Sequence, residues 1–150
     1  MINTLTIRQA GYQDAAVLEV LLEELGGHPI STDEVHNRLA LVERSDIDSI
    51  YLCCEGEDVL GLLSFRIRHN MEEVSKFGEI SGIVVRPEAR RKGVGKALMA
   101  FAEELAEREG CIGTWLVSGF GREEEAHHFY KELGYQITGY RFVKRTEAGE

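Results

Sequence analysis

The chain has 150 residues, 26 of them acidic and 17 basic, so its formal net charge at pH 7 is −9. A chain of this length has the size of one ordinary domain, which buries about 68–70% of its unfolded surface and so forms a real core. The acidic balance argues against a nucleic-acid partner, because neutralising phosphates requires a broad basic face. A cationic substrate suits this balance better, although many proteins are acidic only for solubility.

The N-terminus lacks a basic stretch followed by an apolar one, and no apolar run approaches the about 20 residues of a membrane span. We therefore expect one domain over residues 1–150, a cytoplasmic location and no membrane partner. The cysteines agree with this location, since Cys53 and Cys54 are neighbours, Cys111 stands alone, and neither a CxxC pair nor a disulfide framework occurs. We expect all three to be buried thiols.

The chain begins with patterns that predict one strand and two helices. Residues 4–9 alternate and are rich in β-branched side chains, which favours a strand. A helix follows, with Asp14 as its N-cap and the glycine pair at 26–27 as its stop. A second helix begins at a capping box formed by Ser31 and Glu34.

The middle of the chain predicts three strands. Residues 49–54 and 59–68 form an antiparallel hairpin around the turn EGED, and in its second arm Ser64, Arg66 and Arg68 alternate with apolar residues. After a polar loop, residues 77–85 predict another strand, which Pro87 ends.

The last third of the chain alternates helices and strands. Apolar residues at helical spacing predict a helix from Val94 to about Gly110, followed by a strand over residues 112–118. A helix over residues 122–134 and a final strand over residues 135–144 complete the chain. The order β-α-α-β-β-β-α-β-α-β predicts an α/β (α+β) fold with a mixed sheet flanked by helices.

The stretch RPEARRKGVG, residues 86–95, lies between a predicted strand and a predicted helix. Backbone N–H groups of a glycine turn and of a helix N-terminus converge there, which is the arrangement that binds anions. Arg90, Arg91 and Lys96 add positive charge and fork-shaped donors for phosphate. The acidic chain therefore concentrates basic residues where a polyanion would bind.

Known phosphate-binding motifs fit this stretch poorly. A P-loop requires glycine where this chain has Arg90 and a hydroxyl where it has Ala97. A Rossmann fingerprint has glycine or alanine at the position of Leu98 and lies near the start of a βαβ unit. A lone Gly-x-Gly is also compatible with a solvated turn, and by itself it favours that interpretation.

The longer stretch IVVRPEARRKGVGKAL resembles the acyl-CoA pyrophosphate loop of the GNAT superfamily, in which a strand ending Val-x-Pro precedes Arg/Gln-x-x-Gly-x-Gly/Ala. The matching residues are Val85, Pro87, Arg90, Gly93 and Gly95. IRQAGYQDAAVL resembles the first strand and helix entry of that family, and AHHFYKELGY resembles its Ala-x-x-Phe-Tyr-x-x-x-Gly-Tyr/Phe segment. These segments occur in the family's order and span most of the chain.

The resemblance implies a single-domain N-acetyltransferase with a mostly antiparallel sheet, which moves an acetyl group from acetyl-CoA directly to an amine while both substrates are bound. It implies that the pantetheine arm pairs with the backbone of Ile83 and Val85. Because the strand ends there, we also expect an N–H at or near Val84 to contact the thioester oxygen. The implied cofactor-binding residues are Ile83, Val84, Val85, Arg90, Arg91, Lys92, Gly93, Val94, Gly95 and Lys96.

Glu79 is the candidate general base. It lies eleven residues before Arg90, which is the spacing of the glutamate base in the histone-type members of the family, and strand alternation predicts that it faces the same side as Ser81, Ile83 and Val85. Because a carboxylate is a much weaker base than an amine, this role requires desolvation or a chain of water. The alternative is a surface glutamate that only binds the charge of the substrate.

Tyr130 is the candidate acid, because it matches the tyrosine of the family's Phe-Tyr pair. It lies on an apolar helix face with Phe129, so it is also a candidate core residue whose hydroxyl reaches the site. Glu123 departs from the family, which often has asparagine there to contact pantetheine. His127 and His128 are about 100° apart on a helix and cannot share an ion, so we expect no metal.

The acceptor is expected to be a small-molecule amine, and a homodimer is compatible with the sequence. Two other functions stay open: a protein lysine or N-terminal acetyltransferase, and a non-catalytic acyl-CoA-binding module. The loop HNMEEVSKFG contains Glu72 and Glu73, which would suit a cationic acceptor but are equally compatible with a solvated loop.

Overall fold

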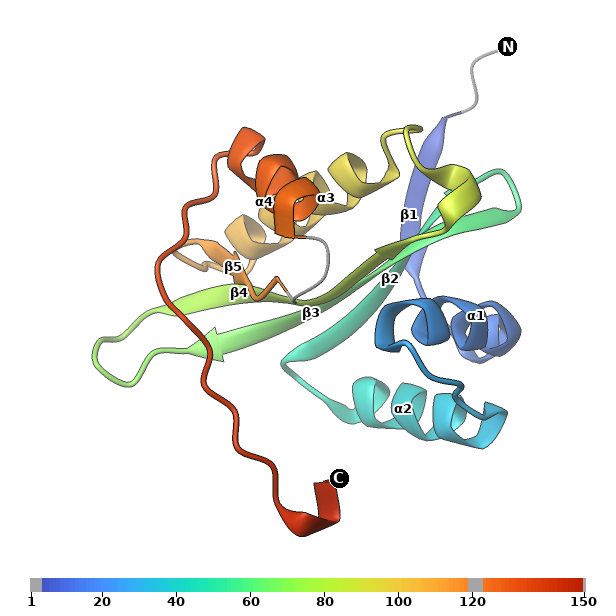
Figure 1. Ribbon diagram of the computed structural model, residues 1–150, viewed down its shortest axis with the longest axis horizontal. Coiled ribbons are helices and arrows are strands. Elements are labelled where there is room, and N and C mark those ends of the chain that lie inside the picture. Colours follow the sequence, from blue (N-terminus) through green and yellow to red (C-terminus); the bar gives the residue numbers. More distant parts are fainter. Residues whose placement is uncertain (1–3, 119–122, 150) are drawn as a thin grey trace. The chain divides into compact units, whose positions relative to one another are not determined.

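The computed structural model describes residues 4–118 and 123–149 (Figure 1). These residues belong to two compact units, Met1–Leu116 and Val117–Glu150. The first unit contains one sheet with strand order β1-β2-β3-β4-β5, in which the first four strands are antiparallel and β5 runs parallel to β4. The strands are β1 (Leu5–Gln9), β2 (Asp48–Glu55), β3 (Asp58–His69), β4 (Lys76–Val85) and β5 (Thr114–Leu116).

Helices cover both faces of this sheet (Figure 1). The helices are α1 (Ala15–Gly26) and α2 (Thr32–Arg44) on one face, and α3 (Val94–Arg108) on the other. In the core on the side of α1 and α2, Leu18 and Leu21 of α1 and Val35 of α2 pack against Leu52 and Leu62 of the sheet. The arrangement confirms the predicted mixed, mostly antiparallel sheet flanked by helices.

A side-chain cap explains where α2 begins, whereas α1 begins without one. Ser31 and Glu34 form the predicted capping box, each accepting a hydrogen bond of 3.1 Å from the backbone N–H of the other. Asp14 occupies the N-cap position of α1, but its side chain does not cap that helix. It accepts instead from Gly11 N at 2.8 Å and from both terminal nitrogens of Arg8 at 2.8 and 2.9 Å.

The described part of the second unit consists of helix α4 (Glu123–Glu132), a short 3-10 helix (Glu147–Gly149) and irregular backbone between them. The predicted strand over residues 135–144 is therefore wrong for this structure. Its alternating apolar side chains are exposed, including Tyr140 at 88% and Phe142 at 95%. Alternation is a local property, whereas a strand also requires a hydrogen-bonding neighbour, and the described part of this unit contains no other strand.

The predicted burial of the cysteines is confirmed for two of the three. Cys53 and Cys54 are buried in β2, and burial raises the pKa of the Cys53 thiol to about 11. Cys111 is only partly buried, because it lies in the irregular segment after α3. Among the described residues, no helix has both the length and the apolar composition needed to cross a bilayer.

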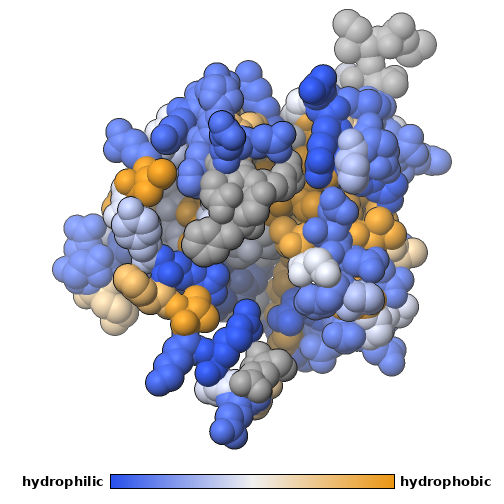
Figure 2. Space-filling model, in the orientation of Figure 1, coloured by the Kyte–Doolittle hydropathy of each residue, from blue (hydrophilic) through white to orange (hydrophobic). Residues whose placement is uncertain are grey.

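The surface over α1 and α2, at the right of Figure 2, mixes hydrophilic and hydrophobic residues. Val20 and Leu25 of α1 are 53% and 42% exposed, and Leu41 of α2 is 44% exposed. Scattered apolar side chains of this kind are normal on a folded surface.

Candidate active site

Strand β4 has a partner along only part of its β5 side. Its register with β5 covers Gly78 to Ile80, which pair with Thr114 to Leu116. Beyond Ile80, no described strand of the first unit pairs with residues 81–85 on that side. The second half of β4 therefore presents backbone groups that another extended molecule can pair with.

A β-bulge lies where the pairing with β5 stops. The β3–β4 ladder pairs Phe65 with Ile80 but Ser64 with Gly82, so Ser81 is an extra residue in β4. An extra residue changes which face the following side chains point to.

Two glycines show this change of face directly. A Cβ on Gly78 would lie 2.6 Å from Cζ of Phe65 and 3.0 Å from Cβ of Ala106, which is in α3. A Cβ on Gly82 would lie 3.0 Å from Cδ2 of Leu25, which is in α1. In a regular strand residues four apart share a face, so the bulge has reversed the facing between these two positions.

The bulge corrects one sequence prediction about Glu79. Its side chain faces the α1 side of the sheet, whereas Ile83 and Val85, beyond the bulge, face α3. Ser81 stays on the side of Glu79, since its Oγ lies 2.8 Å from Oγ of Ser64. The expected common facing of Glu79 with Ile83 and Val85 is therefore wrong, because simple alternation does not hold across an extra residue.

The register also tells which backbone groups of β4 face outward. Arg86 N donates to Leu60 O at 2.9 Å, so on this side of the bulge Val84 directs its N–H and C=O toward β3. Ile83 and Val85 direct theirs to the other side, where β5 has ended. Of the residues at or near Val84, these two have N–H groups that face outward.

The N-terminus of α3 is open to an anion. Its N-cap is Gly93, which has φ of 81° and no side chain, so no side chain caps the first turn. Arg91, two residues earlier, also has a positive φ of 71°, which is costly for a residue other than glycine. The N–H groups of Val94, Gly95 and Lys96 open the helix and have no partner inside it.

Basic side chains surround this N-terminus. Arg90 is 3.6 Å from Glu24 of α1, and Lys92 is 3.5 Å from Glu55 of β2. Arg91 and Lys96 are exposed and make no ion pair within the described residues. Exposed pairs of this length are weak, so these side chains can turn to a phosphate at little cost.

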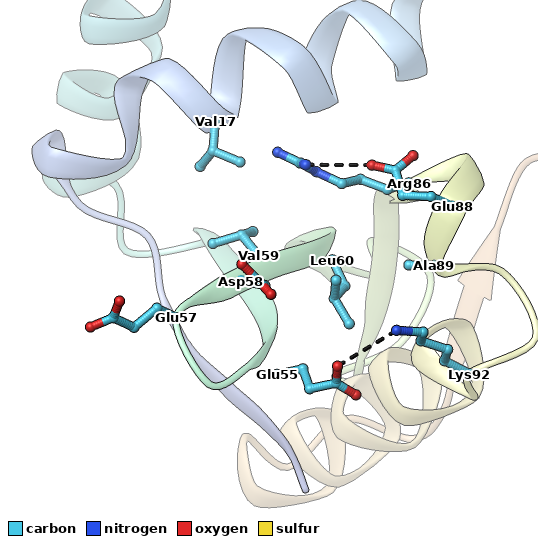
Figure 3. A pocket seen from close by; sticks show the side chains of 10 residues that line it. All are labelled: Val17, Glu55, Glu57, Asp58, Val59, Leu60, Arg86, Glu88, Ala89 and Lys92. Carbon is cyan, nitrogen blue, oxygen red and sulfur yellow. Dashed lines mark hydrogen bonds and ion pairs between the residues drawn. The ribbon is translucent and has the colours of Figure 1, made fainter. Parts of the chain in front are cut away.

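A cavity of about 420 Å³ lies beside this loop, between α1 and the β2–β3 turn (Figure 3). It is lined by more carboxylates than cations. Its charged residues are Glu55, Glu57, Asp58, Glu88, Arg86 and Lys92. Because four carboxylates repel a phosphate, we assign the anion site to the N-terminus of α3 and not to this cavity.

Glu79 lies among polar side chains on the α1 face of the sheet. It pairs with Arg66 of β3 on one side and with Trp115 of β5 on the other. Its Oε1 lies 3.4 Å from Nε of Arg68, and the guanidinium of Arg68 lies 5.7 Å from the centre of the Trp115 ring. The Glu79 side chain is 19% exposed, and its Oε1 makes no hydrogen bond within the described residues.

Tyr130 lies in α4 of the second unit and is half-buried. Its ring lies 5.2 Å from the ring of Phe129 and 6.2 Å from that of Tyr135, and its backbone oxygen accepts from Tyr135 N at 3.0 Å. Glu123 opens the same helix, but its side chain lies outside the described residues. The Nε2 atom of His128 lies 3.1 Å from Oε1 of Glu132 on this helix.

Glu79, the outward backbone of β4 and the open N-terminus of α3 all belong to the first unit, while Tyr130 belongs to the other unit. Sequence reasoning missed Arg68 and Trp115 as neighbours of Glu79. The alternation of Ser64, Arg66 and Arg68 on one arm of the hairpin was the available signal. No group of three or more metal-ligating side chains placed to hold an ion occurs within residues 4–118 and 123–149.

Comparison with curated proteins finds relatives that are named as N-acetyltransferases. The chain is 33% identical over 110 residues to an aminoalkylphosphonate N-acetyltransferase of Salmonella typhimurium, covering 73% of this chain and 62% of the relative. It is 30% identical over 138 residues to an aminoglycoside N(6')-acetyltransferase type 1 of Stenotrophomonas maltophilia, covering 89% of this chain and 87% of that relative.

Solved structures share the fold. An aminoglycoside N-acetyltransferase in complex with CoA aligns over 98% of this chain and 97% of its own, with a TM-score of 0.83 and 20% identity. A putative acetyltransferase from Agrobacterium tumefaciens aligns over 94% and 99%, with a TM-score of 0.84 and 22% identity. The model of the acetyltransferase (GNAT) family matches residues 15–135. The chain therefore belongs to the acetyltransferase (GNAT) family.

Proposed function

We propose that this protein transfers the acetyl group of acetyl-CoA to the amine of a small molecule while both substrates are bound. The observation that carries this proposal is the open N-terminus of α3, with its positive-φ residues and basic side chains, beside the unpaired half of β4. Relatives named for acetylating aminoalkylphosphonates and aminoglycosides support a small-molecule acceptor.

The first proposed task is to bind acetyl-CoA. The N–H groups of Val94, Gly95 and Lys96 receive the pyrophosphate, because uncapped helix N-termini favour negative charge. Arg90, Arg91 and Lys92 add positive charge to this site. The outward N–H and C=O groups of Ile83 and Val85 pair with the amides of pantetheine as a strand would.

The second proposed task is acyl transfer. Acetyl-CoA supplies the acyl group as a thioester, the amine nitrogen forms a bond to the carbonyl carbon, and the C–S bond breaks. Glu79 accepts the proton that the amine loses, directly or through water, and an outward N–H of β4 donates to the oxygen on which negative charge develops. Tyr130 donates a proton to the departing sulfur.

Several other expectations from the sequence stay predictions. One domain over residues 1–150 is supported by the family match over residues 15–135, which spans both compact units. The homodimer, the cytoplasmic location and the lack of a nucleic-acid partner are untested. A protein acetyltransferase and a non-catalytic acyl-CoA-binding module are the alternatives that the experiment below separates from the proposal.

The test is a panel of small amines and lysine-containing peptides with acetyl-CoA, read by release of free thiol and by mass of the product. We expect acetylation of at least one small amine. Turnover on peptides alone would replace the proposal with protein acetylation. Binding of acetyl-CoA in calorimetry without turnover on any amine would leave the acyl-CoA-binding module.

A further inference from the structure

Arg68 lies beside the proposed base and on the same face of the sheet. The β3–β4 ladder is regular along β3, so Arg66 and Arg68 both face the α1 side, as Glu79 does. The Nε of Arg68 is 3.4 Å from Oε1 of Glu79. All of these residues belong to the first unit.

The guanidinium of Arg68 has donors that this structure does not use. It carries five N–H groups, yet its one ion pair within the described residues is the Nε contact to Glu79, which lacks hydrogen-bond geometry. The two terminal nitrogens of Arg8, in contrast, both donate to Asp14, at 2.8 and 2.9 Å. The Arg68 side chain is 52% exposed, so a bound molecule can reach it.

Trp115 restricts the orientation of this guanidinium. The ring centre lies 5.7 Å from Cζ of Arg68, within the range of a cation–π contact. Because Glu79 and Trp115 are register partners and Arg68 lies on the neighbouring β3, three strands hold the carboxylate, the guanidinium and the ring together. An arginine held in this way loses less entropy when it forms further hydrogen bonds.

The charges around Glu79 are unlike those of the whole chain. The chain has a net charge of −9, but Glu79 has two guanidiniums on its own face, those of Arg66 and Arg68. Asp48 lies 3.7 Å from Arg66 and offsets one of them. Once the ammonium of an acceptor pairs with Glu79, a second cationic group would face the guanidinium of Arg68, whereas an acidic group would meet an opposite charge there.

We propose that Arg68 binds an acidic group of the acceptor, so that the preferred acceptor is a short amine that carries a carboxylate or a phosphonate. The ammonium group lies toward Glu79 and the acidic group toward Arg68. This matches a carboxylate and a guanidinium that are only 3.4 Å apart, because the two charges of a short zwitterion are also close together. The inference rests on the proposed function.

The test compares amines that differ in one charge. The anionic acceptors are 3-aminopropanoate and 2-aminoethylphosphonate, the neutral acceptor is 3-aminopropanamide, and the cationic acceptor is 1,3-diaminopropane. We expect Arg68→Gln to lower kcat/KM for an anionic acceptor about 10- to 100-fold more than for the neutral one, the factor that a charge-assisted hydrogen bond supplies. A rise in KM should account for most of this loss.

Comparing each variant with the wild type removes the difference in basicity between the amines. It also separates recognition from an effect on Glu79, since any change in Glu79 alters transfer to all four acceptors alike. Arg68→Lys keeps the charge without the planar fork and should retain part of the preference. Arg108→Gln, at the C-terminal end of α3, should leave the preference unchanged.

Equal losses for the anionic and neutral acceptors in Arg68→Gln, or a wild-type preference for 1,3-diaminopropane, would overturn the inference. Calorimetric titration of 3-aminopropanoate and 3-aminopropanamide into the CoA-bound protein makes the same comparison without turnover. Selective, Arg68-dependent binding without acetylation would contradict the proposed function but support the inference. Acetylation of the acceptors without a charge preference would support the proposed function but contradict the inference.

Discussion

Asp14 and Glu79 are both carboxylates beside an arginine, but their contacts differ in geometry. Asp14 is 6% exposed and accepts three hydrogen bonds of 2.8–2.9 Å, two from Arg8 and one from Gly11. Glu79 has a single contact of 3.4 Å to Arg68, and its Oε1 makes no hydrogen bond within the described residues. The hydrogen bonds of Asp14 therefore stabilise the fold, whereas Glu79 has an oxygen without a hydrogen bond, which can accept a proton.

Replacing Glu79 with glutamine should lower turnover and leave acetyl-CoA binding nearly intact. The change keeps the size of the side chain but removes its ability to take a proton. General base catalysis contributes about 10²–10⁴-fold, which is the loss in kcat that steady-state kinetics should show. Turnover like that of the wild type across the pH profile would mean that another group is the base.

Replacing Asp14 with asparagine should destabilise the protein by about 1–3 kcal/mol near neutral pH, because charge-assisted hydrogen bonds to Arg8 are lost. Hydrogen bonding to Arg8 lowers the pKa of Asp14 in the folded state. Its contribution is therefore complete above the unfolded pKa, about 3.9, and is lost as the pH falls through the lower folded pKa.

Urea unfolding of the wild type and Asp14→Asn at several pH values checks this. The difference in unfolding free energy should be constant above about pH 5 and shrink in acid. Asp58→Asn, an exposed aspartate, serves as the control and should show no such trend. A difference that persists unchanged at pH 2 would show that lost packing, and not charge, causes the destabilisation.

At the scale of elements, two local irregularities create the candidate site. The bulge at Ser81 reverses which face of the sheet the side chains of the second half of β4 point to. Strand β5 pairs only with the first half of β4. The second irregularity is the start of α3, where a glycine without a capping side chain leaves backbone donors unpaired. The open edge follows from the shortness of β5, and a capping side chain at the start of α3 would have occupied part of the N–H groups that the glycine leaves open.

Replacing Gly95 with aspartate should separate the stability of α3 from its ability to bind an anion. A negative charge in the first turn interacts favourably with the helix dipole, so the Tm should stay constant or rise slightly. The same charge repels pyrophosphate, and we expect acetyl-CoA affinity in calorimetry to fall at least about 10-fold.

Gly139→Asp adds the same charge at an open position of the second unit, with nothing within 4 Å of the new Cβ. It should leave the affinity unchanged. If Gly95→Asp is folded and binds acetyl-CoA as tightly as the wild type, the pyrophosphate is bound elsewhere.

At the scale of the molecule, strand β3 and residues 135–144 differ in strand pairing and in burial. Strand β3 is central, with β2 and β4 paired on its two sides and most of its apolar residues buried. Residues 135–144 have a similar alternation of apolar side chains, but they form no strand and are mostly exposed. The same kind of pattern thus has two outcomes, because only one of the segments has neighbours to pair with.

Hydrogen exchange should distinguish these two segments. We expect the amides of residues 136–144 to exchange faster than those of β3, because exposed backbone outside a ladder is weakly protected. Mass spectrometry of peptides at several protein concentrations measures this. Protection of the segment at every concentration would show that it folds as a sixth strand of its own chain, and protection that appears with concentration would indicate pairing in a homodimer.

The amino-acid sequence by itself determined those features that depend on neighbouring residues. The hairpin, the capping box of Ser31 and Glu34, the helix from Val94 and the glycine turn before it were all predicted from local pattern, and the structure has them. Resemblance in the motif around Gly93 and Gly95 also predicted the family, since a phosphate loop requires particular residue types at fixed spacing.

Only the tertiary structure decided which residues meet across the sheet. The extra residue at Ser81 is defined by the pairing of two strands and has no signature in β4 alone, so alternation misplaced Ile83 and Val85 relative to Glu79. The contact of Arg68 with Glu79 and Trp115 joins three strands. The missing sixth strand has the same cause, because periodicity is a property of one segment, whereas a hydrogen-bonded ladder is a property of two.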